Sequence, residues 1–316
     1  MSASALPPGL PPGLPPGLVI PPGLAIAQPQ PDVIPDVKPR TGLGGFIWRY
    51  PTIALGGVLL GLMLAMALLA PFLWTVDPAA LAPAQRLRDP SAQNWFGTDM
   101  LGRDIYSRVV YGAQVSLLVG FAVALFASGI GLLIGLFSGF SRLADAVIMR
   151  VMDGLMSIPP ILLAIALMAL TRGSVGNVIL AITVAEIPRV SRLVRGVVLS
   201  LREQPYVEAA IASGTPTWKI ILKHILPNTL APLTVQASYI CAAAMITEAI
   251  LSFIGAGTPP TIPSWGNIMA EGRALWQVFP QIVLFPAVFL SITVLAVNLL
   301  GDGLRDRLDP RLARRI

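Results

Sequence analysis

The chain of 316 residues is 55% hydrophobic and only 12% charged, with a mean hydropathy of +0.75. Because soluble proteins carry about 25% charged residues, this composition excludes an ordinary soluble domain and indicates a protein of the lipid bilayer. The single cysteine, Cys241, has no partner for an internal disulfide, and the single histidine, His224, excludes a zinc site built from Cys and His clusters.

The formal net charge of +6 and the pI near 10 do not indicate a nucleic-acid-binding protein. The basic residues form neither one long run nor an aromatic-flanked patch, so no nucleic-acid partner is expected. The N-terminus has no basic n-region, and the first apolar run begins only at Thr52 and is too long for a signal-peptide h-region. We therefore expect the basic residues to report membrane topology, and we expect no cleavable signal peptide.

Residues 1–40 contain four copies of PPGL, which begin at Pro7, Pro11, Pro15 and Pro21. Proline at this density removes amide donors and favours extended polyproline II, while a period of four excludes collagen. We predict a disordered, Pro/Gly-rich cytoplasmic tail over residues 1–40, followed by a transmembrane domain over 41–316. A linker is preferred over a ligand for a proline-binding groove.

Six apolar runs reach the length of about 20 residues that a helix needs to cross a bilayer. We predict an all-α polytopic bundle with spans at residues 52–74, 114–138, 151–171, 175–193, 230–254 and 280–301. Six spans place both termini on one side. With the N-terminus inside, 16 of the 22 Lys and Arg residues fall on the cytoplasmic side, which agrees with the positive-inside rule and puts both termini in the cytoplasm.

Small residues recur at helical spacing in the second span. They are Ser116, Gly120, Ala124, Ser128, Gly131, Gly135 and Gly139. Because helices in lipid associate through close contact of small residues, this face predicts a tight approach by another helix. Lining of a substrate path is the alternative. Small residues between Ala237 and Ala249, with Cys241 among them, predict a similarly slim fifth span.

Three ionisable residues fall within the predicted spans: Asp153, Glu186 and Glu248. A charge at the bilayer centre costs roughly 2.5 to 3.5 kcal/mol on insertion scales, so each is a candidate for a transport role. All three lie near predicted span ends, however, where water and headgroups lower that cost. We therefore interpret them as satisfied helix-end carboxylates.

A polar segment, residues 202–228, separates the fourth and fifth spans, and we call it the elbow. Alanines after Glu208 favour a short helix, Gly214 supplies a positive φ at its end, and Thr215 and Pro216 can start a second helix. Leu226-Pro227-Asn228 is then expected to turn the chain into the fifth span. The face of Ala209, Ala212 and Ser213 lacks the bulky apolar anchors of a membrane-lying helix, which favours insertion into a groove of another protein.

The elbow resembles the EAA loop of permease subunits in bacterial ABC importers. The matching residues are Glu208, Ala209, Ala210, Gly214, Leu226 and Pro227, with His224 where the general pattern has isoleucine. Three further blocks resemble the C-type permeases of the dipeptide, oligopeptide and nickel importers: FGTDMLGRDIYSRVVYGAQVSL, LSFIGAGTPPTIPSWGNIM and NLLGDGLRDRLDPRL. Gln114 departs from the family, where an arginine is common before Val-Ser-Leu.

The resemblance implies the type I ABC importer permease fold and a bacterial inner-membrane location. It also implies the partners: a homologous second permease, two cytoplasmic ATPases that bind ATP and Mg²⁺, an extracytoplasmic solute-binding protein, and a peptide substrate. ATP binding would close the ATPase pair and move the elbow and its attached helices. The chain itself has no GxxxxGK[ST] loop, so we expect no bound cofactor or metal and no enzymatic activity.

Several alternatives stay open at this point. Nickel, haem or another small solute could replace peptide as the cargo, and an ion-coupled secondary transporter is a different class of function. A membrane enzyme would need a reactive cluster that this sequence does not supply. The outer segments, 75–113 and 255–279, are expected to meet the binding protein, and their Trp95, Phe96 and Trp265 are interpreted first as interfacial anchors.

Overall fold

The computed structural model describes residues 50–308, which all belong to one unit, Thr41–Ile316. The predicted tail over residues 1–40 lies outside the described residues. Within 50–308 the ordered elements are helical, and the only β-type pairing there is an isolated bridge between Thr98 and Asp104. The prediction of an all-α fold is confirmed.

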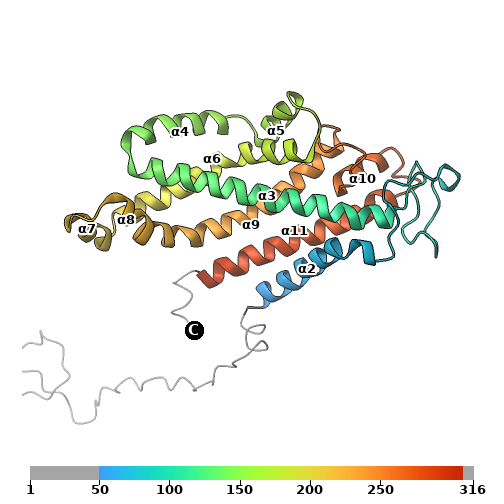
Figure 1. Ribbon diagram of the computed structural model, residues 1–316, viewed down its shortest axis with the longest axis horizontal. Helices are drawn as coiled ribbons and strands as arrows, with labels where there is room; N and C mark the ends of the chain where they lie inside the picture. The colour runs from blue at the N-terminus through green and yellow to red at the C-terminus, as the bar shows by residue number, and fades with distance from the viewer. Residues whose placement is uncertain (1–49, 309–316) are drawn as a thin grey trace, which may run out of the picture. The chain divides into compact units, whose positions relative to one another are not determined.

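The helices follow the order of the predicted spans (Figure 1). They are α2 (Pro51–Leu68), α3 (Ile105–Phe140), α4 (Arg142–Met156), α5 (Pro160–Ala169), α6 (Val175–Arg202), α7 (Pro205–Ala212), α8 (Thr217–Ile220), α9 (Leu226–Phe253), α10 (Trp265–Gly272) and α11 (Gln281–Leu308). A π-helical turn, η3 (Ile221–Ile225), joins α8 to α9, and two 3₁₀ turns, η1 (Ala70–Phe72) and η2 (Pro83–Gln85), follow α2.

The prediction of six spanning helices is not matched in count. Four helical runs among the described residues are long and apolar enough to cross a membrane: 51–68, 105–140, 217–253 and 281–308. A fifth arises only if α4 and α5, which meet at 87°, form one broken span.

Local sequence explains why the predicted third and fourth spans are not found as single apolar helices. The predicted third span contains Pro159-Pro160, and a proline disfavours helical backbone in the residue before it, so Pro159 is extended and α5 begins anew at Pro160. The predicted fourth span begins where α6 begins, but α6 continues to Arg202 and carries charged residues from its middle onward, beginning with Glu186. Because of those charges, α6 does not contain an apolar stretch long enough to count among the helices that could cross a membrane.

Successive long helices run in opposite directions along the bundle (Figure 1). The start of α2, the end of α11 and the α7–α8 segment all lie toward one end, which we call the elbow end. The segment between α2 and α3 lies with α10 toward the opposite end, which we call the loop end. The bundle therefore separates the elbow from both predicted outer segments.

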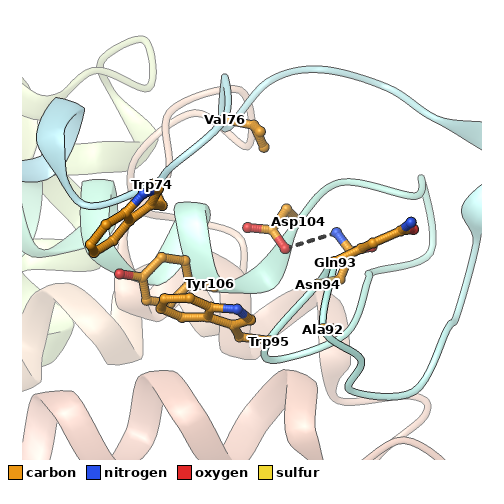
Figure 2. A pocket seen from close by; sticks show the side chains of 8 residues that line it. All are labelled: Trp74, Val76, Ala92, Gln93, Asn94, Trp95, Asp104 and Tyr106. Carbon is orange, nitrogen blue, oxygen red and sulfur yellow. Dashed lines mark hydrogen bonds between the residues drawn. The ribbon is translucent and has the colours of Figure 1, made fainter.

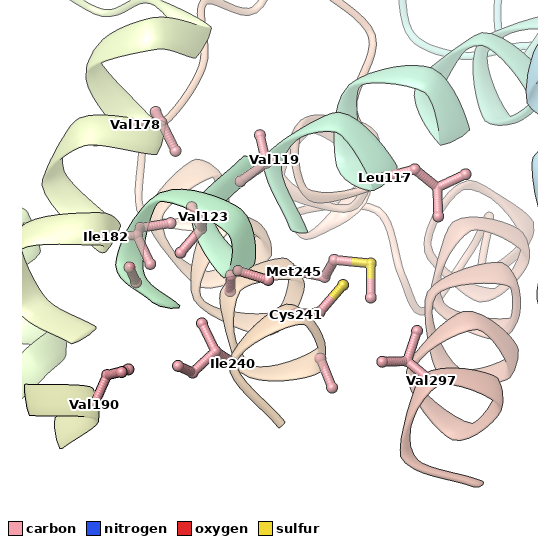
Figure 3. Close-up of a cluster of buried hydrophobic side chains, with 14 of the residues drawn as sticks. Leu117, Val119, Val123, Val178, Ile182, Val190, Ile240, Cys241, Met245 and Val297 are labelled. Carbon is pink, nitrogen blue, oxygen red and sulfur yellow. The ribbon is translucent and has the colours of Figure 1, made fainter. Parts of the chain in front are cut away.

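The core lies where α3 packs against α6 and α9, with α11 packed against α9 and α2. Figure 3 shows its apolar side chains, among them Val123, Ile182, Ile240 and Met245. A Cβ atom added to Gly131 or Gly135 would lie 2.5 or 2.6 Å from the Cβ of Val190 or Val194 on α6, and one on Gly120 would lie 2.7 Å from Met245 Cγ on α9. Ala124 and Ser128 are also buried on α3. The absence of a side chain at these glycines is what lets the helices approach.

Candidate functional site

The first arm of the elbow is the short helix α7. Pro205 occupies its first turn, where no amide donor is needed, and Glu208 stands in the same turn, where a negative charge complements the helix dipole. Val207 is fully buried, whereas Glu208 and Ala209 are exposed and Ala210 is half-buried. One side of α7 is thus anchored to the bundle, and the EAA residues lie on the surface or at its edge.

Gly214 ends this arm in the way expected from its position. Its φ is +72°, its N–H donates to Ile211 O (2.9 Å), and the N–H of Thr215 donates to Ala210 O (3.1 Å). These two bonds form a Schellman motif, which satisfies carbonyl groups at the end of a helix. Nothing lies within 4 Å of a Cβ built on Gly214, so its backbone conformation, and not close packing, is what favours glycine there.

The second arm differs from the expectation in two respects. Pro216, and not Thr215, precedes α8 as the N-cap residue. The chain also does not turn at Leu226-Pro227, because α8, η3 and α9 form one helical run from Thr217 to Phe253.

The π-helical turn explains how this run accommodates a proline. The N–H of Leu226 donates to Ile221 O, five residues back, and Pro227 follows in the first turn of α9. The side-chain amide of Asn228 then donates to His224 O (2.7 Å) and satisfies a carbonyl group at this irregular turn. The second arm of the elbow is therefore continuous with a bundle helix.

The first arm is tied to the bundle at the end of α6. Arg202 donates from Nη1 to the carbonyl of Gly139 (2.7 Å), and its guanidinium lies 5.2 Å from the centroid of the Phe140 ring. These contacts fix the last turn of α6 against the last turn of α3. Both ends of the elbow thus continue into packed helices.

The exposed surface of the elbow is more apolar than expected. Ala209, Ala212 and Ser213 are exposed, as the sequence suggested. Ile211 and Trp218, which do not belong to that small-residue face, are 52% and 60% exposed, so the elbow also presents bulky apolar side chains that the sequence analysis did not consider. An apolar surface of this kind is typical of an interaction site.

The three ionisable residues of the predicted spans have different surroundings. Asp153 is exposed and pairs with Arg192 (2.5 Å), and Glu186 is buried and lies 3.4 Å from Arg189. Glu248 is fully buried on α9, where its Oε1 accepts from Ser252 Oγ (2.8 Å) while Oε2 has no partner among the described residues. Glu248 is therefore only half satisfied as a helix-end carboxylate.

A charged network at the loop end was missed by the sequence analysis. Arg108 Nη1 lies 2.6 Å from Asp99 Oδ2 and 2.5 Å from Glu271 Oε2, and Arg103 bonds to both of the same carboxylates. The network joins the segment before α3, through Asp99 and Arg103, and the first turn of α3, through Arg108, to Glu271 of α10, which lies 163 residues after Arg108. The only sequence signal was the GTDMLGRD motif, which contributes two of its members, Asp99 and Arg103.

The aromatic residues of the outer segments take three different roles. Trp265 is fully buried and donates from Nε1 to Val109 O (3.0 Å), so its interpretation as an interfacial anchor is wrong. Phe96 stacks on Phe285 with ring centroids 3.8 Å apart. Trp95 is exposed and lies with Trp74, Tyr106 and Asp104 around a pocket of about 460 Å³ (Figure 2).

Gln114, where the family pattern commonly has arginine, has a local role. Its Nε2 donates to Ala67 O (2.8 Å) and links α3 to the last turns of α2. Within residues 50–308 no group of three or more His, Cys, Asp or Glu side chains is placed to hold a metal ion.

The chain matches the family model for the "Binding-protein-dependent transport system inner membrane component" over residues 129–314, a range that contains the elbow. It is 54% identical over 267 residues to the probable peptide ABC transporter permease protein y4tQ of Sinorhizobium fredii, covering 84% of this chain and 91% of that protein. It is 42% identical to the dipeptide transport system permease protein DppC of Alkalihalophilus pseudofirmus, covering 81% and 85%. With the glutathione transport system permease protein GsiD of Pectobacterium atrosepticum the identity is 40%, covering 84% and 89%.

The fold is similar to a chain of the MetNI methionine ABC transporter in its inward-facing conformation. The TM-score is 0.53 at 22% sequence identity, and the match covers 65% of this chain and 98% of that chain. At this identity the likeness supports the fold alone.

Proposed function

The chain belongs to the family of binding-protein-dependent transport system inner membrane components, and on that premise we propose that it is a permease subunit of an ATP-driven peptide importer. The family is a membrane component of transport systems and not an enzyme. Peptide is proposed as the substrate because the relatives at 54% and 42% identity are named for peptide and dipeptide transport. Nickel or haem would be the cargo under the alternative that the sequence left open.

The elbow is the observation that carries the coupling role. It lies at one end of the bundle, its surface includes Glu208, Ala209 and exposed apolar side chains, and it continues into packed helices on both sides. A rigid, exposed and doubly anchored element is suited to receive a push from another protein. Glu208, Ala209, Ala210, Gly214, Leu226 and Pro227 are the residues to which we assign this contact.

The partners follow from this assignment. Two cytoplasmic ATPase subunits would bind ATP and Mg²⁺ and contact the elbow, a homologous permease would complete the translocation path, and an extracytoplasmic solute-binding protein would deliver the peptide at the loop end. The chain would lie in the bacterial inner membrane with both termini in the cytoplasm. The charge distribution of 16 basic residues among 22 on the proposed inner side supports this orientation.

The continuity of α8, η3 and α9 suggests how the motion would be transmitted. Because Thr217–Phe253 is one helical run, a displacement of the elbow would tilt α9 without bending at Pro227. The Schellman bend at Gly214 would fix the angle between the two arms. Stiffness at this bend is therefore the property that the coupling needs.

Replacement of Gly214 tests the proposal. A valine at φ +72° would strain the bend by roughly 1 to 3 kcal/mol, and no side-chain clash contributes because the space around Gly214 is open. In a reconstituted complex we expect Gly214→Val to lower both the ATP hydrolysis that the loaded binding protein stimulates and the uptake of a labelled dipeptide.

Gly214→Asn is the matched control, because asparagine tolerates the left-handed region better, and its loss should be smaller. Unchanged hydrolysis and uptake in Gly214→Val would refute the role of the bend. A wild-type complex that imports Ni²⁺ or haem but no peptide would refute the proposed substrate.

A further inference from the structure

A pocket at the loop end has the composition of a cation-binding site. Its lining comes from three stretches of chain: Trp74 and Val76, residues 92–95, and Asp104 with Tyr106 (Figure 2). No basic side chain is among the residues that line it. Three aromatic rings and one carboxylate are thus brought together on the side of the molecule that lies away from the elbow (Figure 1).

The aromatic residues form the outer part of the pocket. Trp74 is 83% exposed and Trp95 is 50% exposed, and the rings of Trp95 and Tyr106 lie 4.8 Å apart at an angle of 51°. Tyr106 is held in place because its hydroxyl donates to Leu73 O (3.0 Å). Trp74 has a φ of +52°, which is uncommon for a residue other than glycine. Such rings attract a cation placed over their faces.

The carboxylate of Asp104 lies deeper, because Asp104 is only 8% exposed. Its Oδ2 accepts from the amide (2.8 Å) and hydroxyl (2.6 Å) of Ser107, and its Oδ1 accepts from Asn94 Nδ2 (3.0 Å). All of these donors are neutral, and none of the ion pairs within residues 50–308 includes Asp104. By contrast, the nearby Asp99 is bound by both Arg103 and Arg108.

Asp104 also caps α3, and this role explains its bonds to Ser107. Capping does not explain why three aromatic rings line the same pocket as the carboxylate. The partial positive charge at the start of α3 compensates only part of the carboxylate charge. A cation that enters the pocket would therefore meet a buried negative charge that no side-chain cation neutralises.

The position of the Asp104 carboxylate below the aromatic rings indicates what kind of group would fill the pocket. The charge must reach Asp104 at the inner side, while the part that follows must pack against Trp74, Trp95 and Tyr106. Lysine and arginine side chains have this form, because a long apolar stem carries the cationic group at its tip. A compact ammonium ion would leave the aromatic walls without a partner.

We propose that this pocket binds a lysine or arginine side chain that the solute-binding protein presents when it docks at the loop end. This inference rests on the proposed function, which places the binding protein at that end. The aromatic rings enclose the stem, and the Asp104 carboxylate forms a charge-assisted hydrogen bond with the cationic tip. Electrostatic attraction at such a site favours one docking register and depends on ionic strength.

Asp104→Asn separates the charge from the cap, because asparagine caps helices as well as aspartate does. Affinity of the binding protein for the complete complex in nanodiscs is measured at low and at physiological salt. We expect Asp104→Asn and Trp95→Leu each to weaken binding by about tenfold at low salt, with a smaller salt dependence in Asp104→Asn. Asp89→Asn, the same charge change at an exposed position of the same outer segment, should leave the affinity unchanged.

Competition experiments and a change of lipid identify the source of the cation. Arginine amide should compete with the binding protein for the wild-type complex and should compete less with Asp104→Asn, whereas butanol should not compete. Wild-type affinity for Asp104→Asn in a folded complex with an unchanged unfolding midpoint would overturn the proposal. So would a loss that occurs only in nanodiscs containing phosphatidylethanolamine, since the pocket would then bind a lipid headgroup. If the binding protein does not stimulate ATP hydrolysis by the wild-type complex, the proposed function fails. If hydrolysis is stimulated but Asp104→Asn and Trp95→Leu bind the binding protein as tightly as the wild type does, this inference alone fails.

Discussion

Three glycines on α3 show how single residues set the distance between helices. Gly131, Gly135 and Gly139 lie at steps of four and face Val190, Val194 and Val198 on α6, which also lie at steps of four. A Cβ atom on any of the three would come within 2.6 Å of a valine side-chain atom. Because α3 and α6 pack over their length here, the pairing of glycine with valine fixes the register of the two helices.

Gly135→Val is expected to destabilise the bundle, whereas Gly129→Val on the same helix is not. A side chain at 135 must displace Val194 and the backbone of Ser191, which costs roughly 1 to 3 kcal/mol, while nothing lies within 4 Å of a Cβ at 129. Both variants carry the same small penalty for a β-branched residue in a helix, so the difference between their thermal unfolding midpoints isolates the packing. Equal midpoints would show that α3 and α6 can separate without loss.

At the scale of elements, α4 is attached to α6 mainly by charged side chains. Arg195 makes two bonds to Asp145, one of them from Nη2 at 2.7 Å, and Arg192 pairs with Asp153. The opposite side of α4 is apolar and exposed at Leu143, Val147 and Val151. Because α6 leads directly into α7, we infer that α4 moves together with the elbow.

A double-mutant cycle on Asp145 and Arg195 checks this attachment. We expect Asp145→Arg to lower dipeptide uptake and the double variant Asp145→Arg with Arg195→Asp to restore much of it. In the free energy of unfolding we expect a coupling energy of about 0.5 to 1 kcal/mol between the two residues, since the pair is partly screened by solvent. The same cycle on Asp153 and Arg192, which are both half-exposed, should give a smaller value. Failure of the reversed pair to recover uptake would exclude an electrostatic attachment.

At the scale of the whole molecule, two surfaces lie toward opposite ends of the bundle. The elbow presents exposed apolar side chains at one end, and the network of buried Asp99, Arg103 and Arg108 with the half-buried Glu271 braces the segment before α3 at the other. Separation of these residues would leave an uncompensated buried charge, which is costly. The intact network therefore keeps this end rigid. A rigid outer surface and a rigid elbow are suited to pass a conformational change between partners on opposite sides of a membrane.

Cysteine labelling tests the proposed orientation. Cys241 is the single cysteine of the chain, so its replacement by alanine gives a cysteine-free background. In that background a membrane-impermeant maleimide should label Ala80→Cys in spheroplasts and Asp306→Cys only in inside-out vesicles. Both positions are exposed, and the segments that carry them, the one between α2 and α3 and the end of α11, lie toward opposite ends. The reverse pattern would show that the proposed topology is inverted and that the elbow lies outside the cytoplasm.

Properties that depend on a short stretch of chain were determined by the sequence alone. Hydrophobic length predicted the helical class and the positions of α2, α9 and α11, because burial of apolar residues in lipid depends on local composition. Gly214 predicted the bend of the elbow, because a positive φ is a property of one residue. The ordered motifs predicted the family to which the chain belongs.

Properties that depend on packing were decided only by the tertiary structure. The burial of Trp265 and the continuity of α8 with α9 depend on neighbouring elements, so local patterns misjudged both. The Arg108–Glu271 contact and the pocket around Asp104 join residues from separate stretches of chain. A local sequence pattern does not predict such contacts, because they form, and contribute free energy, only once the helices have packed.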